Sequence, residues 1–305
     1  MTGRDHRALP VRTGTSPESP RDRLEAFRAL AADLAPRDLQ DLMSYPFFSL
    51  TKTKRIWPID YHAGDIAIRV EGTAAHGIAT IWDADVLIWA ASQIIEARDA
   101  GIETSRLLVA TPYEILSFAG RGTSGRDYLR LKAAFDRLQS TSVATSIRRP
   151  SSRRLHRFSW LNEWKERSSG EGRPVGLELL LPDWFYATVL DSSLVLTLDR
   201  AYFRLTSGIA RWLYRLARKH AGRQPDGWRF DFRHLHARSG SLARYADFAI
   251  DLRRIARAGS LLGYRIEIER SRRGAEILHV RAAPTHRIER TVSELAARFR
   301  MGDKL

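Results

Sequence analysis

Arginines spaced along one predicted helix are the first candidates for binding chemistry in this sequence. Residues 126–141 read RDYLRLKAAFDRLQST, and at about 100° per residue Arg126, Arg130 and Arg137 fall on the same side of a helix. The opposite side carries the apolar residues Tyr128, Leu131, Phe135 and Leu138. A guanidinium donates two parallel hydrogen bonds to a phosphate or to a guanine edge, so this face is suited to contacting DNA. The alternative is a charged face that meets only solvent.

A second basic cluster follows this helix. Residues 148–157 read RRPSSRRLHR, and their five arginines are Arg148, Arg149, Arg153, Arg154 and Arg157. We predict a loop between two short strands, 145–147 and 158–161, that runs along the phosphate backbone as a wing beside the helix. Arg121, in the turn before the helix, is expected to contact DNA as well.

The second half of the chain repeats this pattern. An apolar stripe of the same spacing occurs 117 residues further along, at Tyr245, Phe248, Leu252 and Ile255. The helix that carries it is predicted at 241–258, and a hairpin with a basic tip follows at 264–269 and 275–280. The candidate DNA-binding residues of this half are Arg238, Arg244, Arg253, Arg254, Arg257, Arg272 and Arg273. Asp247 and Ile250 share part of the outer face, so no residue here is assigned to a base.

The elements that must position these arginines follow from periodicity and from turn residues. For the first half we predict a hairpin at 64–80, a helix at 83–98, a strand at 107–109, a short helix at 111–119, a glycine turn at 120–125 and a strand at 175–181. For the second half we predict a strand at 194–197, a helix at 199–220, a short helix at 232–238 and a turn at Gly240. A short helix, a turn and a longer helix form the helix-turn-helix plan, whose second helix enters the major groove.

The predicted fold class is therefore α+β, with two tandem winged helix-turn-helix domains. The first of these domains is expected at 41–182 and the second at 183–284. Residues 1–40 are expected to hold a disordered arm and a short helix at 21–35, and residues 285–305 a tail that is compatible with a helix. The aromatic stretch 42–50 (LMSYPFFSL) is expected to pack on the first domain.

Composition favours a nucleic-acid partner and a reducing compartment. The net charge is +15, and 44 of the 50 basic residues are arginine. Arginine-rich codons explain part of that number, but they do not explain why acidic residues fail to match it, and such a surplus attracts polyanions. The chain has no cysteine and no apolar run typical of a signal peptide or a membrane span, so we expect a cytoplasmic protein without membrane partners.

Motifs typical of enzymes are weak in this sequence. Residues 120–125 read GRGTSG, but the dinucleotide fingerprint requires a preceding strand, and the residues before this turn are predicted to be helical. His234 and His236 resemble the metal-binding pair of rolling-circle nicking enzymes, yet residues two apart on a helix point in different directions. No phosphate-binding loop or zinc-protease motif occurs. We therefore expect no enzymatic activity, no cofactor and no metal site.

Three strings connect the sequence to a known family. Residues 42–50 (LMSYPFFSL), 121–148 (RGTSGRDYLRLKAAFDRLQSTSVATSIR) and 202–222 (YFRLTSGIARWLYRLARKHAG) resemble the plasmid replication initiator protein A family of alphaproteobacteria. The resemblance covers residues 42 to 284. It implies a protein that binds repeated sites at a plasmid origin, opens the duplex and recruits host replication factors.

The expected partners follow from this resemblance. They are double-stranded DNA with origin repeats, host replication initiation or helicase-loading proteins, and a second copy of the chain, since related initiators also form dimers that repress their own gene. Two alternatives stay open at this point. One is a transcriptional regulator with the same two domains, and the other is a rolling-circle nicking enzyme.

Overall fold

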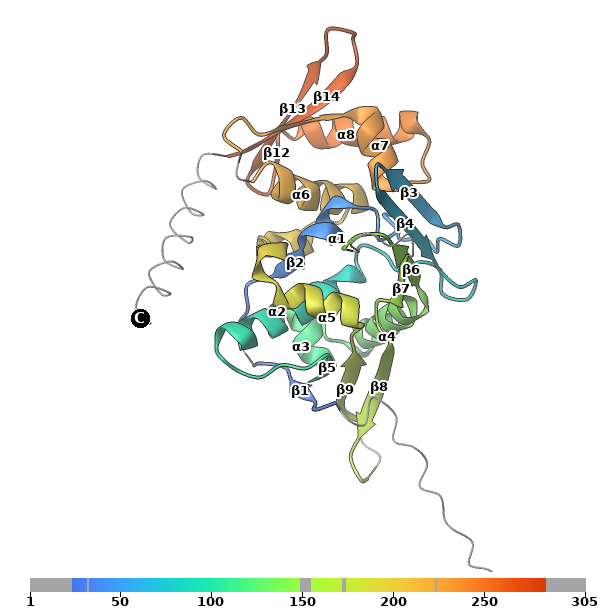
Figure 1. The fold of residues 1–305 in the computed structure, drawn as a ribbon, viewed down its shortest axis with the longest axis vertical. Coiled ribbons are helices and arrows are strands. Elements are labelled where there is room, and N and C mark those ends of the chain that lie inside the picture. The colour runs from blue at the N-terminus through green and yellow to red at the C-terminus, as the bar shows by residue number, and fades with distance from the viewer. Residues whose placement is uncertain (1–23, 32, 149–154, 172–173, 223, 284–305) are drawn as a thin grey trace, which may run out of the picture.

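The computed structural model describes residues 24–31, 33–148, 155–171, 174–222 and 224–283. The predicted arm at 1–20, Arg149, Arg153, Arg154 and the tail at 285–305 lie outside these residues. Helices and three four-stranded sheets share one continuous apolar core, so the expected α+β class is confirmed. In Figure 1, two β-hairpins project from opposite ends of the molecule's long axis.

The first unit is built around one almost fully buried helix. Its elements are α2 (Ala84–Asp99), β5 (Leu107–Ala110), α3 (Pro112–Phe118), α4 (Gly125–Ser140), β8 (Glu163–Ser168) and β9 (Pro174–Leu180). β5 pairs with β9 and β9 with β8, both antiparallel. The helices predicted at 83–98, 111–119 and 126–141 are thus confirmed within two residues, and the strand predicted at 175–181 is β9.

Capping fixes the turn between α3 and α4. The Thr111 hydroxyl accepts a hydrogen bond from the Glu114 backbone N–H, and the Glu114 carboxylate accepts one from the Thr111 backbone N–H, which is a capping box at the start of α3. Ser124 and Asp127 form the same reciprocal pair at the start of α4. Each box satisfies backbone N–H groups that have no partner in the first helical turn. The two helices therefore begin at defined residues.

A separate four-stranded sheet interrupts the first unit between α4 and β8. Its strands, in the order β3-β4-β6-β7, are β3 (Ile59–Ala63), β4 (Ile66–Glu71), β6 (Ser142–Thr145) and β7 (His156–Ser159). The hairpin predicted at 64–80 is therefore wrong in position. The observed hairpin joins β3 to β4, turns at Gly64, which has a φ of 55°, and ends at Glu71. The other edge of β4 pairs with β6.

The second unit repeats the order of the first. Its elements are α6 (Gly208–His220), β11 (Trp228–Asp231), α7 (Phe232–Ser239), α8 (Tyr245–Arg257), β13 (Tyr264–Arg270) and β14 (Glu276–Ala282), with the short β12 (Ser260–Leu261) beside β13. The sheet order β11-β14-β13 matches β5-β9-β8 of the first unit. The central residues of the two apolar stripes, Phe135 and Leu252 among them, are fully buried.

Two predicted helices are corrected by the structure. The helix at 199–220 is broken into a short 3-10 helix, η2 (Arg200–Arg204), and α6, whose N-cap is Ser207. Ser207 caps α6 by accepting a hydrogen bond from the Ala210 backbone N–H. Gly208 then passes so close to Leu50 that a Cβ would lie 2.0 Å from its carbonyl oxygen, which favours glycine at this position. The helix at 21–35 is absent from the described residues after 23. Instead β1 (Phe27–Arg28) pairs in parallel with β5.

The remaining elements join the two units. β2 (Arg37–Leu39) pairs with β10 (Val195–Thr197), and α1 (Gln40–Ser44) packs on α6. α5 (Asp183–Leu190) packs on α2, and η1 (Ser192–Leu194) leads from it into β10. The aromatic stretch is buried as expected, with Phe47 and Phe48 against Trp160.

Buried ion pairs fasten α6 to the first unit. Arg211 donates to Asp85 of α2 at 2.8 Å, and Arg215 donates to Asp38 of β2 at 2.7 Å. The Arg215 and Asp38 side chains are each 2% exposed. Charges this deeply buried are tolerated only in pairs, so α6 has one orientation on the first unit.

Removing one member of the second pair tests this attachment. Arg215→Met should lower the free energy of unfolding by about 3–5 kcal/mol, because Asp38 would stay buried without its counter-charge. Arg69→Met is the matched control, since Arg69 forms exposed ion pairs with Asp60 and Glu71, and it should cost less than about 1 kcal/mol. Urea unfolding followed by circular dichroism gives both values. Equal losses in the two variants would contradict the assignment.

Candidate nucleic-acid interface

The exposed face of α4 keeps two of the three predicted arginines. Arg126 is exposed in the first turn of the helix. Arg130 is 66% exposed and lies 3.2 Å from Asp127, which is the capping residue of the same helix. Both guanidiniums therefore stand on the outer surface, on the side opposite the buried stripe of Leu131, Phe135 and Leu138.

Arg137 does not lie on that free face, and this corrects its expected orientation. Its guanidinium donates two hydrogen bonds, of 2.8 and 2.7 Å, to the buried carboxylate of Asp83 just before α2. These hydrogen bonds raise the pKa of Arg137 above its ordinary value. The residue anchors α4 to the start of α2 instead of pointing away from the protein.

Two further predicted contacts are also directed inward. Arg121 donates to the Asp85 carboxylate and to the Trp82 carbonyl, both at 2.7 Å. Arg148 adopts a positive φ of 65° and donates to Asp41 at 2.6 Å, with its guanidinium over the Trp184 ring. These contacts hold the turn before α4 and the end of β6 in place.

The hairpin that accompanies α4 is β8–β9, which corrects the predicted wing. The segment 148–157 connects β6 to β7 in the other sheet, and of its described arginines Arg157 is exposed on β7. The β8–β9 hairpin belongs to the sheet of β5 and carries two exposed cations, Lys165 and Arg167. Sequence reasoning missed β8 because EWKERS has no apolar alternation.

A carboxylate links α4 to this hairpin. Glu166 of β8 accepts hydrogen bonds from the Tyr128 hydroxyl and, at 2.9 Å, from the Lys132 ammonium. Burial, followed by the hydrogen bond to Glu166, raises the pKa of Tyr128 to about 12. The hydroxyl thus remains a proton donor at physiological pH, and the helix and the hairpin are connected by two side-chain hydrogen bonds.

The second unit presents a corresponding helix with a more mixed charge. Arg244, Arg254 and Arg257 of the α8 region are exposed, but Arg244 pairs with Asp247 and Arg254 with Asp251. These acidic partners offset part of the positive charge on this helix. The face resembles that of α4 in position but not in charge.

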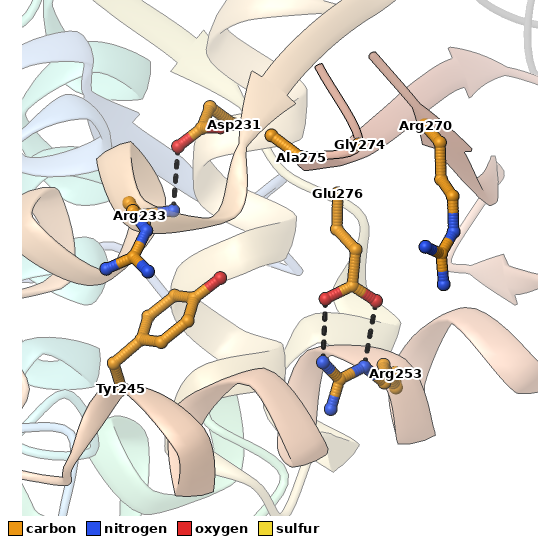
Figure 2. Close-up of a pocket in the computed structure, with 8 residues that line it drawn as sticks. All are labelled: Asp231, Arg233, Tyr245, Arg253, Arg270, Gly274, Ala275 and Glu276. Carbon is orange, nitrogen blue, oxygen red and sulfur yellow. Dashed lines mark hydrogen bonds and ion pairs between the residues drawn. The ribbon is translucent and has the colours of Figure 1, made fainter. Parts of the chain in front are cut away.

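A pocket lies between α8 and the β13–β14 hairpin. It has a volume of about 410 Å³, and Figure 2 shows its lining residues, which are Asp231, Arg233, Tyr245, Arg253, Arg270, Gly274, Ala275 and Glu276. Arg253 donates two hydrogen bonds, of 2.9 and 2.6 Å, to Glu276 and so ties the helix to the hairpin. Arg270 belongs to the basic hairpin that the sequence predicts, whereas Arg233 of α7 was not singled out from the sequence. Arg272 and Arg273 are exposed at the hairpin tip, as expected for a basic tip.

A bridge segment, residues 51–58, connects the first unit to the α7–α8 turn of the second. Its buried Arg55 donates to the carbonyls of Trp57 and Pro58 and, at 2.5 Å, to that of Gly240 in the turn. Burial lowers the pKa of Arg55 to about 10, so it stays charged at neutral pH. Trp57 is 68% exposed, and Lys52 and Lys54 are exposed beside it. Sequence analysis did not identify this segment.

Arg238 lies at the same junction and faces inward, against the prediction that it contacts DNA. It donates to the Ser44 carbonyl at 2.7 Å, and its guanidinium lies over the Tyr45 ring and 3.3 Å from Nε2 of His220. His220 also packs against the rings of Trp228 and Phe230. Burial first, and then the charge of Arg238, lower the pKa of His220 to about 4.

The motifs that suggested enzymes take ordinary structural positions. The GRGTSG segment, residues 120–125, joins helix α3 to helix α4 and follows no strand. A ring nitrogen of His236 lies 2.8 Å from the Ala243 carbonyl oxygen, within the α7–α8 turn. Among the described residues, no group of three or more His, Cys, Asp or Glu side chains is placed to hold a metal ion. In that same part of the chain, no helix combines the length and apolar character needed to cross a bilayer.

Comparisons with known proteins agree with this architecture. Residues 37–266 match the model of the family described as replication initiator protein A. A "putative replication protein" of Wigglesworthia glossinidia brevipalpis is 30% identical over 228 residues, which are 73% of this chain and 82% of that protein. The chain therefore belongs to the replication initiator protein A family, as its sequence resemblance indicated.

Solved structures show a related fold. A crystal structure of domains 2 and 3 of RctB superposes with a TM-score of 0.56 at 15% identity, covering 79% of this chain and 96% of that one. A second RctB structure, of domains 2–3, gives a TM-score of 0.54 at 16% identity, with 82% and 99% covered. At such identity the likeness concerns the fold alone.

The buried histidine predicts how stability responds to acid. An unfolded His220 binds a proton below about pH 6.5, whereas the folded one does so only below about 4, so acid favours the unfolded chain between these values. Stability present above pH 6.5 should fall by about 2–3 kcal/mol as the pH drops through 4. His220→Gln, which cannot titrate but can still accept from Arg238, should lose less over the same range. Denaturant unfolding at several pH values gives the free energy of unfolding of both proteins. If this free energy fell equally with pH in the wild type and in His220→Gln, the buried histidine would not be the cause.

Proposed function

We propose that this protein initiates plasmid replication by binding repeated origin DNA through two winged helix-turn-helix units. The observation that carries the proposal is the repeated element order, helix, strand, helix, helix and hairpin, with one shared sheet order. In each unit the last helix, α4 or α8, carries exposed arginines and is tied by side chains to its hairpin. Such a helix enters the major groove, and the hairpin follows the backbone.

Membership of an initiator family supports the biological role, and the charge distribution supports the ligand. The exposed cations on α4, on β8 and at the β13–β14 tip are suited to phosphates, whose neutralisation releases counterions. The two units are joined by buried ion pairs, so their helices would meet the DNA at one fixed separation. Adjacent major grooves on one face of a duplex are about 34 Å apart, and direct repeats at that period are the sites we propose.

The proposal assigns no catalytic residue to this chain. Opening of the duplex and recruitment of host helicase-loading factors would follow from binding, in the cytoplasm where plasmid DNA resides. A transcriptional regulator could use the same surface. A transformation assay separates the two roles, because only an initiator gene sustains a plasmid that carries its origin in a host lacking that gene.

Substitutions on α4 test the proposed reading helix. Arg126→Ala and Arg130→Ala should each weaken binding to a duplex from the origin by about 5- to 150-fold, while binding to a scrambled duplex falls less. Fluorescence anisotropy at fixed salt concentration, with the duplex taken from the region that the protein protects, gives both affinities. Arg137→Ala should act differently, lowering the melting temperature because Asp83 loses its partner.

Arg98→Ala is the matched control for these variants. Arg98 is at the end of α2, where it pairs with Asp99 and the Leu190 carbonyl, away from the α3–α4 turn. It should leave both affinities unchanged. If Arg126→Ala and Arg130→Ala also kept the full affinity for origin DNA, α4 would not be the reading helix.

A further inference from the structure

Several exposed apolar side chains lie on or near the elements that are proposed to bind DNA. Eleven large hydrophobic residues are exposed in the described part of the chain, and nine of them lie in the helix pairs, hairpins and β11 of the two units or in the bridge segment. The nine are Ile56, Trp57, Tyr113, Leu129, Val175, Trp228, Leu242, Ile250 and Ile268. Exposed apolar residues that are scattered singly need no explanation, so each of them carries an argument only through its own position and neighbours.

Leu129 occupies the most informative position among them. It is 66% exposed in the second turn of α4, three residues after Arg126 and next to Arg130. The opposite side of the helix is fixed by the buried Leu131 and Phe135, so Leu129 cannot turn into the core. The N-terminal half of a reading helix is the part that meets base edges.

We propose that Leu129 contacts the 5-methyl group of a thymine in the major groove, and so determines specificity at that base pair. This inference rests on the proposed function. The thymine methyl is the apolar group among the base edges of that groove, whereas the other edges present hydrogen-bond donors and acceptors. A leucine pressed against those edges would desolvate them without replacing their hydrogen bonds, which costs free energy.

The charges around Leu129 favour DNA over a protein partner. Arg126, three residues before it, and Arg130, the next residue, are both exposed, and Arg130 is paired with Asp127. Both arginines are suited to a phosphate or a guanine beside the thymine. By the 117-residue offset of the two stripes, Ala246 of α8 corresponds to Leu129. The exposed Ile250 lies one turn later, with Asp247 and Asp251 as well as Arg254 near it on the helix. The α4 position therefore combines an apolar side chain with a local positive charge, and α8 does so less clearly.

Deoxyuridine substitution tests the contact, because deoxyuridine differs from thymidine only by the missing methyl group. Each thymine of the protected duplex is replaced in turn, and the affinity of the full chain is measured by anisotropy. We expect a loss of about three- to tenfold at one thymine, or one per repeat. In Leu129→Ala the difference between thymine and deoxyuridine should vanish at that position and persist elsewhere.

Leu190→Ala is the matched control, since Leu190 is an exposed leucine at the end of α5, outside the two units. It should keep the wild-type pattern at every thymine. Melting temperatures of both variants should equal that of the wild type, because both side chains are exposed and neither fills the core. A change in melting temperature of Leu129→Ala alone would show a structural role and overturn the inference.

The remaining outcomes separate this inference from the proposed function. The wild-type protein could bind thymine and deoxyuridine duplexes equally at every position, while Arg126→Ala still weakens binding to origin DNA. This result would overturn the inference and leave the proposed function standing. A thymine preference that survives in Leu129→Ala would assign it to another residue. Leu129→Ala that keeps the preference but no longer retains a host replication protein would instead identify a protein-docking surface. If the wild-type protein bound origin DNA no more tightly than a scrambled duplex, the proposed function itself would be overturned.

Discussion

One buried carboxylate controls how the two halves of this protein meet. Asp85 of α2 accepts from Arg211 of α6 on one oxygen and from Arg121, in the turn before α4, on the other. The same side chain thus positions the first helix of the second unit and the start of the proposed reading helix of the first unit. Because a buried charge must keep its partners, neither contact can be given up without a large cost in free energy. Asp38 and Arg215 add a second constraint of the same kind.

Sixteen arginines are predicted from the sequence to contact DNA. Internal ion pairs and hydrogen bonds explain why several of them do not face outward, although the net charge is +15. Arg121, Arg137, Arg148 and Arg238 were predicted to reach outward, yet each is bound to a carboxylate or a backbone carbonyl within the fold. Their charge is used to orient the turn before α4, α4 itself, β6 and the junction between units. The surplus that remains exposed is smaller but is held on rigid elements, so less side-chain and interdomain ordering would be needed on binding.

The sequence predicts those features that depend on neighbours along the chain. Helical periodicity located α4 and α8, and α3 lies within the short helix predicted at 111–119. A helical wheel, however, only shows which residues face away from a helix's own apolar stripe. It does not show that Asp83, 54 positions before Arg137, covers part of that outer side. For the same reason the wing was placed in the basic loop, since the pairing of β9 with β5 is a long-range choice that the polar strand β8 does not reveal. The close approach of Gly208 to the distant Leu50 carbonyl is likewise invisible to local periodicity.

Two kinds of contact on α4 would respond differently to salt, and this gives the surface a division of roles. Contacts of Arg126 and Arg130 with phosphates weaken as salt rises, because counterions return to the DNA. Burial of the Leu129 side chain against a methyl group depends on removing apolar surface from water and is not screened. The arginines would therefore set the strength of binding at a given ionic strength, while the leucine would preserve discrimination between base pairs across ionic strengths. Phosphate contacts carry no sequence information, so a helix that made only such contacts would bind all sequences with affinities that fall alike as the salt concentration increases.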